Sequence, residues 1–139
     1  MKCLGRIVAL MVISTLVSSG CGRIQSDLSG PSISDISTSG KVLVISDCPS
    51  TSVTITAKVT DKSKITHVLL WYRIGADRSF ASINMDIQND VYTAVMNGPD
   101  LQGHGYGAIE FYITAEDAQG NTSESPHDDS LEFLPCVSN

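Results

Sequence analysis

The sequence contains few basic residues, few aromatic residues and no long hydrophobic run. Its 139 residues, enough for one small domain, include nine Lys and Arg against 15 Asp and Glu, a formal net charge of −6. Without clustered Lys and Arg, the chain lacks the surface that binds a phosphate backbone, which excludes a nucleic-acid partner. The apolar run at residues 7–17 is roughly half the ~20 residues of a spanning helix, which disfavours a permanent transmembrane anchor.

Catalytic motifs are also missing. The chain has no G-x-S-x-G elbow, no H-E-x-x-H signature and no P-loop. The Gly-rich residues 103–107 lack the lysine and the strand-to-helix context of a phosphate cradle. No motif places His67, His104 or His127 beside an activated nucleophile. We therefore predict no enzymatic activity and no cofactor, with a small hydrolase as a less favoured alternative.

Residues 1–20 have the features of a signal peptide. A short basic start precedes the apolar run, and small residues follow it. The segment ending in Ser18-Ser19-Gly20-Cys21 resembles the lipobox of bacterial lipoproteins, although that family usually has an aliphatic residue where Ser18 stands. The resemblance implies cleavage before Cys21, acylation of its thiol, and stable anchoring at the bacterial cell envelope by two or three acyl chains. The alternative is a plain secretory signal and a secreted protein.

Two of the four cysteines belong to the N-terminal targeting segment and two belong to the domain. Cys3 leaves with the signal and Cys21 is the predicted lipid site, so Cys48 and Cys136 remain. Two thiols in an exported chain predict one disulfide, which would close a loop of roughly ninety residues and stabilise the fold by about 4–5 kcal/mol. Zinc is the weaker alternative, because there is no C-x-x-C pair and His127 lies outside a usual ligand spacing from Cys136.

The rest of the chain has the alternation of β-strands and no helical stripe of useful length. Residues 21–31 begin with the lipid-anchor Cys and continue as a polar, Ser- and Gly-containing segment, which predicts a flexible tether. Residues 53–60 alternate strictly between apolar and polar, the pattern of a half-buried antiparallel strand. Further strands are predicted at residues 32–38, 41–45, 65–74, 80–87, 91–96, 109–117 and 130–137. Short strands separated by turn residues are typical of an all-β sandwich.

Three segments look like those of bacterial immunoglobulin-like modules of the fibronectin type III-like kind. They are VTITAKVTD at 53–61, ITHVLLWYR at 65–73 and IEFYITAEDAQGN at 109–121. The resemblance covers most of residues 32–137 and implies an immunoglobulin-like antiparallel β-sandwich of about seven strands. Related modules often carry one Cys ahead of the second strand and one at the end of the last, where Cys48 and Cys136 stand. The fold hosts adhesion, spacing and partner binding alike, so it names no single function.

One sheet face is predicted to gather apolar side chains. Leu69 and Trp71 alternate with the core positions of their strand, and Tyr112 does so in the strand at 109–117. Because these strands are neighbours in such a sandwich, we expect the three side chains to form a patch on an outer face. Rigid aromatic side chains anchor protein or sugar partners. The alternatives are a cross-strand pair that only steadies the sheet by about 0.2–1 kcal/mol, or a register that buries Trp71.

Carboxylates near strand ends make a calcium-binding module a further alternative. The candidates are Asp61, Glu116, Asp117, Asp128 and Asp129. However, Asp61 and Asp117 each precede a turn, where an Asp side chain accepts local backbone N–H groups. No EF-hand or aspartate-ladder spacing is present, so we predict no metal.

Together these patterns predict a non-catalytic lipoprotein of the cell envelope. Its domain would recognise a protein or a glycan, serve in adhesion, or act as a spacer, while the N-terminal lipid binds the membrane. The alternative is a passive structural accessory with no ligand. The patterns do not predict an oligomeric state.

Overall fold

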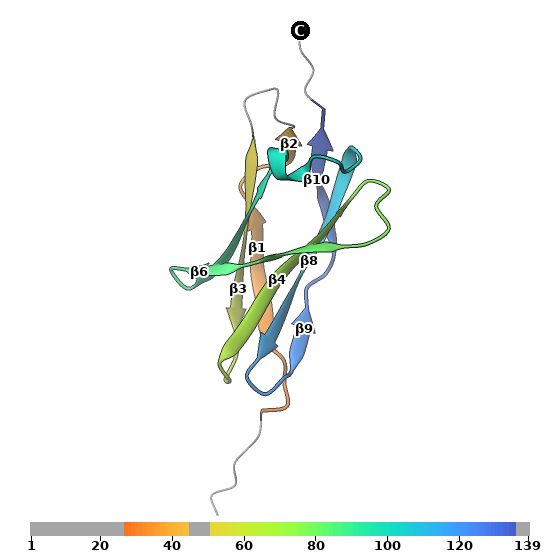
Figure 1. Ribbon diagram of the computed structural model, residues 1–139. Coiled ribbons are helices and arrows are strands. Elements are labelled where there is room, and N and C mark those ends of the chain that lie inside the picture. Colours follow the sequence, from red (N-terminus) through yellow and green to blue (C-terminus); the bar gives the residue numbers. More distant parts are fainter. Residues whose placement is uncertain (1–26, 45–50, 136–139) are drawn as a thin grey trace, which may run out of the picture.

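The computed structural model describes residues 27–44 and 51–135. In these residues ten strands form two packed sheets, which confirms the predicted all-β sandwich (Figure 1). The strands are β1 (Ser32–Thr38), β2 (Val42–Val44), β3 (Ser52–Thr60), β4 (Ile65–Ile74), β5 (Ala81–Asn84), β6 (Asp86–Gln88), β7 (Val91–Asn97), β8 (Gly107–Asp117), β9 (Thr122–Glu124) and β10 (Asp128–Leu134). Nothing in the described chain forms a helix long and apolar enough to cross a membrane.

The two sheets differ in size. The smaller sheet has the order β1-β3-β7-β6, and the larger has the order β2-β10-β8-β4-β5, with β9 paired to β8. This arrangement is compatible with an immunoglobulin-like domain. Among the described pairings β2 and β10 run parallel, and every other described pair of strands is antiparallel. The parallel pair arises because the chain leaves β1 in one sheet and enters β2 in the other, between the strands predicted at residues 32–38 and 41–45.

The core lies between the sheets and is built from alternating residues. In β3 the apolar positions face inward and are buried, while the threonines and the lysine between them face outward, as the sequence predicts. The largest fully buried side chains include Phe111, Phe133, Leu43, Ile55, Leu70, Ile74, Met96, Leu101 and Ile109. Each such residue stabilises the fold by roughly 1.5–3 kcal/mol relative to leaving it in water.

Residues 80–87 form two strands instead of the single one expected. β5 pairs with β4 in the larger sheet, and β6 pairs with β7 in the smaller one. Between them Met85 is buried, and its N–H donates to the carbonyl of Val68 at 2.9 Å. The chain therefore crosses between sheets at Met85, a change that alternation alone does not reveal.

Three other strands also differ from expectation. β8 begins at Gly107, before the expected residue 109, and the last strand, β10, begins at Asp128, before the expected residue 130. β9 was not expected, because Thr122–Glu124 contains no apolar residue to give a pattern; it is held instead by pairing with β8. Together with the split strands, these short pieces account for ten strands where about seven were expected.

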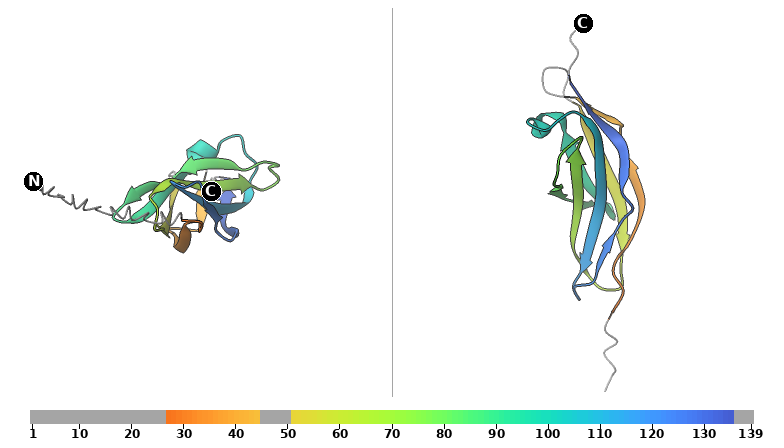
Figure 2. Two further views of the ribbon diagram at one scale, coloured as in Figure 1. Left: turned by 90° about the horizontal axis from the view of Figure 1, so that it is seen from below. Right: turned by 90° about the vertical axis from the view of Figure 1, so that its right-hand side faces the viewer.

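The connection between β7 and β8 contains the short 3-10 helix η1 (Gly98–Leu101). η1 lies at the upper end of the sandwich (Figure 1), and its Leu101 is buried as part of the core. A Cβ atom at Gly98 would lie 1.9 Å from the carbonyl oxygen of Val44, so this close approach requires glycine. The described chain enters at the opposite, lower end and finishes near η1 at the upper end (Figure 2).

Candidate functional site

A cluster of rings lies on the outer face of the larger sheet. Trp71 on β4 and Tyr112 on β8 are direct cross-strand partners, with ring centroids 6.3 Å apart and planes 11° apart. His127, from the connection between β9 and β10, stacks on Tyr112 with centroids 4.4 Å apart. Phe80 meets Tyr112 edge-on at 5.0 Å. Leu69 lies two residues from Trp71 on the same face of β4. We call these five residues the ring cluster.

Hydrogen bonding fixes the orientation of the indole in the ring cluster. Trp71 Nε1 donates to Thr114 Oγ1 at 2.9 Å, which satisfies its polar group and sets its ring orientation. Both Trp71 and Tyr112 are half-buried, so each presents part of its ring to solvent. A partly exposed ring held in one orientation loses little conformational entropy when a partner packs on it.

Charged groups frame the cluster on one side. Arg73 Nε donates to Glu110 Oε2 at 2.7 Å, and the guanidinium lies over the Phe80 ring, 4.8 Å from its centroid. The other carboxylate oxygen of Glu110 lies 2.6 Å from His127 Nδ1. The hydrogen bonds from His127 and then Arg73 hold the pKa of Glu110 below its usual value. The same contact with Glu110, followed by one with Glu124, raises the pKa of His127.

The structure brings together all three residues predicted for this face. Leu69, Trp71 and Tyr112 lie on neighbouring strands in the predicted register. Whether they bind a partner stays a prediction. The sequence patterns did not predict the Arg73–Glu110 pair, Phe80 or His127. The pair could have been found, because the Trp71–Tyr112 register places Arg73 opposite Glu110 two residues along each strand. Phe80 and His127 come from connecting segments, which have no periodic pattern.

Three carboxylates meet at the lower end of the sandwich. Oxygens of Asp27, Asp61 and Asp117 lie within 4.8 Å of one another. Asp27 precedes β1, Asp61 follows β3, and Asp117 ends β8. Ser63 Oγ donates to Asp27 Oδ2 at 3.1 Å, and Asn121 Nδ2 donates to the Asp27 carbonyl at 3.0 Å. The segment before β1 is therefore bound to two turns, and its contacts begin earlier than the expected domain start at residue 32.

Local hydrogen bonds keep the carboxylates of Asp27 and Asp117 charged. Bonds from the Ser29 hydroxyl and N–H lower the pKa of Asp27 to about 2. Burial opposes the charge of Asp117, but bonds from Asn121 and Gln119 outweigh it and hold the pKa of Asp117 below its usual value. The two turn bonds, from Ser63 N–H to Asp61 and from Asn121 N–H to Asp117, confirm the turn roles predicted for these aspartates.

The predicted calcium candidates do not all converge. Of the five, Asp61 and Asp117 come together, and Asp27 joins them without having been predicted. Glu116 instead faces His67 at 3.9 Å, and Asp128 accepts the Ser130 N–H at 2.7 Å. The trio is the group of described residues that has carboxylate oxygens close enough to hold a metal ion. The expectation of no metal stays a prediction.

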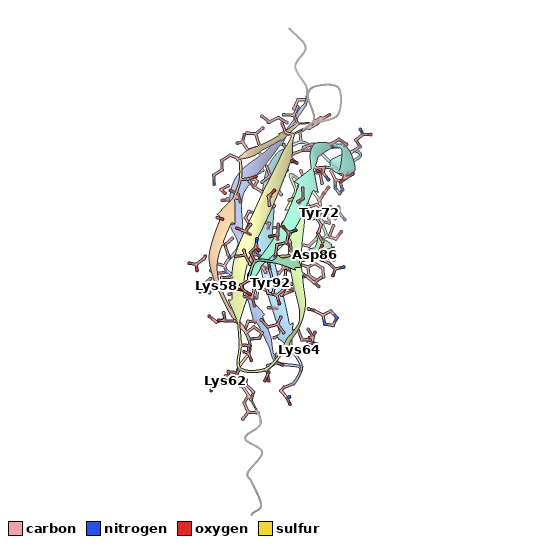
Figure 3. The ribbon with its side chains drawn as sticks, turned by 90° about the vertical axis from the view of Figure 1, so that its left-hand side faces the viewer. Lys58, Lys62, Lys64, Tyr72, Asp86 and Tyr92 are labelled. Atoms are coloured by element: carbon pink, nitrogen blue, oxygen red, sulfur yellow. The ribbon has the colours of Figure 1, made fainter. Side chains whose placement is uncertain are left out.

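The outer face of the smaller sheet has a different character. It carries hydroxyl side chains, including Thr54, Thr56 and Thr93, and Thr56 shares a 2.7 Å hydrogen bond with Ser37 of β1. Lys58 belongs to the same face and is exposed (Figure 3). We call this surface the hydroxyl face. None of its described residues makes a ring contact of the kind found across the sandwich.

The predicted lipid site and disulfide cannot be placed. Cys21, Cys48 and Cys136 all lie outside the described residues. Acylation and the Cys48–Cys136 bond therefore stay predictions. His104, one of the histidines considered for catalysis, pairs with Asp77 at 2.7 Å, and the expected absence of enzymatic activity also stays a prediction.

Comparison with known proteins adds no relative. No family model and no curated protein matches the chain.

Proposed function

We propose that the chain is an exported, lipid-anchored lipoprotein of the bacterial envelope whose immunoglobulin-like domain recognises a protein or glycan through the ring cluster. The observation that carries this proposal is the stack of Trp71 and Tyr112 on an outer sheet face, with the indole N–H already bonded. Preorganised, half-exposed aromatic side chains are typical anchors of recognition surfaces. The domain acts by binding, without catalysis.

The lower-end contacts suggest how the domain is held above a membrane. Cys21, the proposed lipid site, lies six residues before Asp27, which is bonded to two turns of the sandwich. Six residues span at most about 22 Å, so the carboxylate end would stay close to the membrane. The 11 residues of β8 extend about 35 Å, and so carry η1 and the upper end away from the membrane. The ring cluster would then face sideways, accessible to envelope partners.

A passive accessory domain is the second candidate. The ring contacts of Tyr112 with Trp71, Phe80 and His127 favour it, because they are all internal to the domain. If the domain is passive, the rings only stabilise the sheet, and replacing Trp71 abolishes no binding to another molecule.

Site-specific photocross-linking in intact cells separates the two candidates. A photoreactive residue replaces Ser82, which is exposed and paired with Trp71 on β5, and in a matched variant replaces Lys58 on the hydroxyl face. Recognition through the ring cluster predicts adducts from position 82 and few from position 58. Equal yields, or none from either position, would support the passive alternative.

A further inference from the structure

The His127 ring is held by groups on both of its nitrogen atoms. Nδ1 lies 2.6 Å from Glu110 Oε1, and Nε2 lies 3.4 Å from Glu124 Oε1. A neutral imidazole has one N–H, so it can donate to only one of these carboxylates. The imidazolium has two and can donate to both. The geometry therefore fits the charged ring better than the neutral one.

The neighbours of His127 on each element strengthen this preference. β8 contributes Glu110 and Tyr112, β9 contributes Glu124, and the connection after β4 contributes Phe80, whose ring centroid lies 5.9 Å away. Arg73 on β4 is the nearby cation, and Glu110 lies between the two because it binds Arg73 through its other oxygen. Two carboxylates and the face of Tyr112 all attract a positive charge on the imidazole.

The ring also covers a surface. The imidazole lies parallel to Tyr112, with planes 3° apart and centroids 4.4 Å apart, so it occupies one face of the phenol. His127 is still 44% exposed, so solvent leaves it room to turn away. Two contacts hold it over Tyr112: the 2.6 Å hydrogen bond between Nδ1 and Glu110, and the 3.4 Å ion pair between Nε2 and Glu124. The ion pair requires the charged imidazole, in which both nitrogen atoms carry a proton.

We propose that His127 is a protonation-controlled lid over Tyr112, closed when the imidazole is charged and open when it is neutral. Losing the second N–H removes the donor to one carboxylate and the cation from the ring face, which frees the side chain to leave. Tyr112 then gains an open face beside Trp71. The effect of the lid on recognition rests on the proposed function, but the motion itself does not.

Nuclear magnetic resonance of the full chain tests the lid directly. The imidazole proton shifts of His127 and the nuclear Overhauser effect between its ring protons and those of Tyr112 are followed from acidic to alkaline pH. We expect His127 to titrate above the ordinary value of 6.5, and the Overhauser effect to be strong below that midpoint and lost above it. An effect of equal strength on both sides would overturn the lid, because the ring would stay in place when neutral.

Two variants add a control within the same protein. Glu124→Gln removes the charge that faces Nε2, so it is expected to lower the His127 midpoint and to open the lid at lower pH. His67→Gln changes another surface histidine that faces a carboxylate, and is expected to leave the His127 midpoint and the Overhauser effect unchanged. A His127 midpoint that ignores Glu124→Gln would contradict the two-carboxylate arrangement.

The nuclear magnetic resonance titration uses the protein without a binding partner, so its result does not depend on the result of the cross-linking. A lid that fails to open leaves recognition by the ring cluster intact but unregulated. A lid that opens on a domain with no adducts at position 82 would contradict the proposed function and leave the lid standing.

Discussion

The two outer faces of the sandwich carry different kinds of side chain. On each sheet the outward side chains alternate with the buried core residues, but the larger sheet presents rings and ion pairs and the smaller sheet presents hydroxyl groups. Threonine on a strand satisfies the preference for β-branched residues and needs no partner. The ring cluster has more interactions than a strand residue needs. Its rings pack on one another, the indole N–H is hydrogen-bonded, and the Arg73–Glu110 ion pair lies beside them. The two faces therefore differ in how far their side chains depend on one another.

The largest effect should come from removing the centre of the ring cluster. Tyr112→Ala loses ring contacts with Trp71, Phe80 and His127, and is expected to lower the free energy of unfolding by about 2–3 kcal/mol. Thr93→Ala on the hydroxyl face is the matched change and should cost about 0.5 kcal/mol. Urea denaturation measures both, and similar losses would erase the distinction between the faces.

A smaller effect is expected at the anchor of the segment that carries His127. Ser125 is 5% exposed; its Oγ accepts the Ile113 N–H at 2.9 Å and donates to the Pro126 carbonyl. Ser125→Ala leaves a buried N–H without that acceptor, which costs about 2 kcal/mol. The measurement is urea denaturation together with the His127–Tyr112 Overhauser effect. Retention of wild-type stability would mean that this hydroxyl does not hold the segment.

The stability that the ring cluster contributes should depend on pH. The pKa of His127 is raised in the folded protein, so its contribution is fully present below the unfolded value of 6.5. That contribution is lost as pH rises through the raised folded value. Unfolding free energies of the wild type and His127→Gln should therefore differ at acidic pH and converge at alkaline pH. A difference that is constant across this range would show that protonation of His127 contributes nothing.

The smallest effect is expected within the hydroxyl face. Thr56→Ala removes the hydrogen bond with Ser37, but both groups are solvated and can bond to water instead. The expected change is below about 0.5 kcal/mol by urea denaturation. A loss above about 1 kcal/mol would mean that this face, too, holds a network that the sandwich needs.

Sequence patterns predicted the sandwich and the central pair of the ring cluster because both rest on strict alternation. Trp71 and Tyr112 belong to long strands whose inward positions are apolar, which fixes the outward register. Phe80 and His127 come from connections, where position depends on tertiary packing. The position of Asp27 could not be predicted for the same reason. It lies in a short polar segment without a periodic pattern, and hydrogen bonds to two distant turns hold it in place.

The central claim, that the ring cluster is a recognition surface, is tested most directly by the yield of cross-linked partner from position 82 in cells that carry Trp71→Ala. The variant must first be shown to fold, by its urea transition, and Trp71→Phe serves as the conservative control. Recognition through the ring cluster predicts that Trp71→Ala abolishes the adduct while the domain stays folded, and that Trp71→Phe retains part of it. An undiminished adduct from folded Trp71→Ala would contradict the claim.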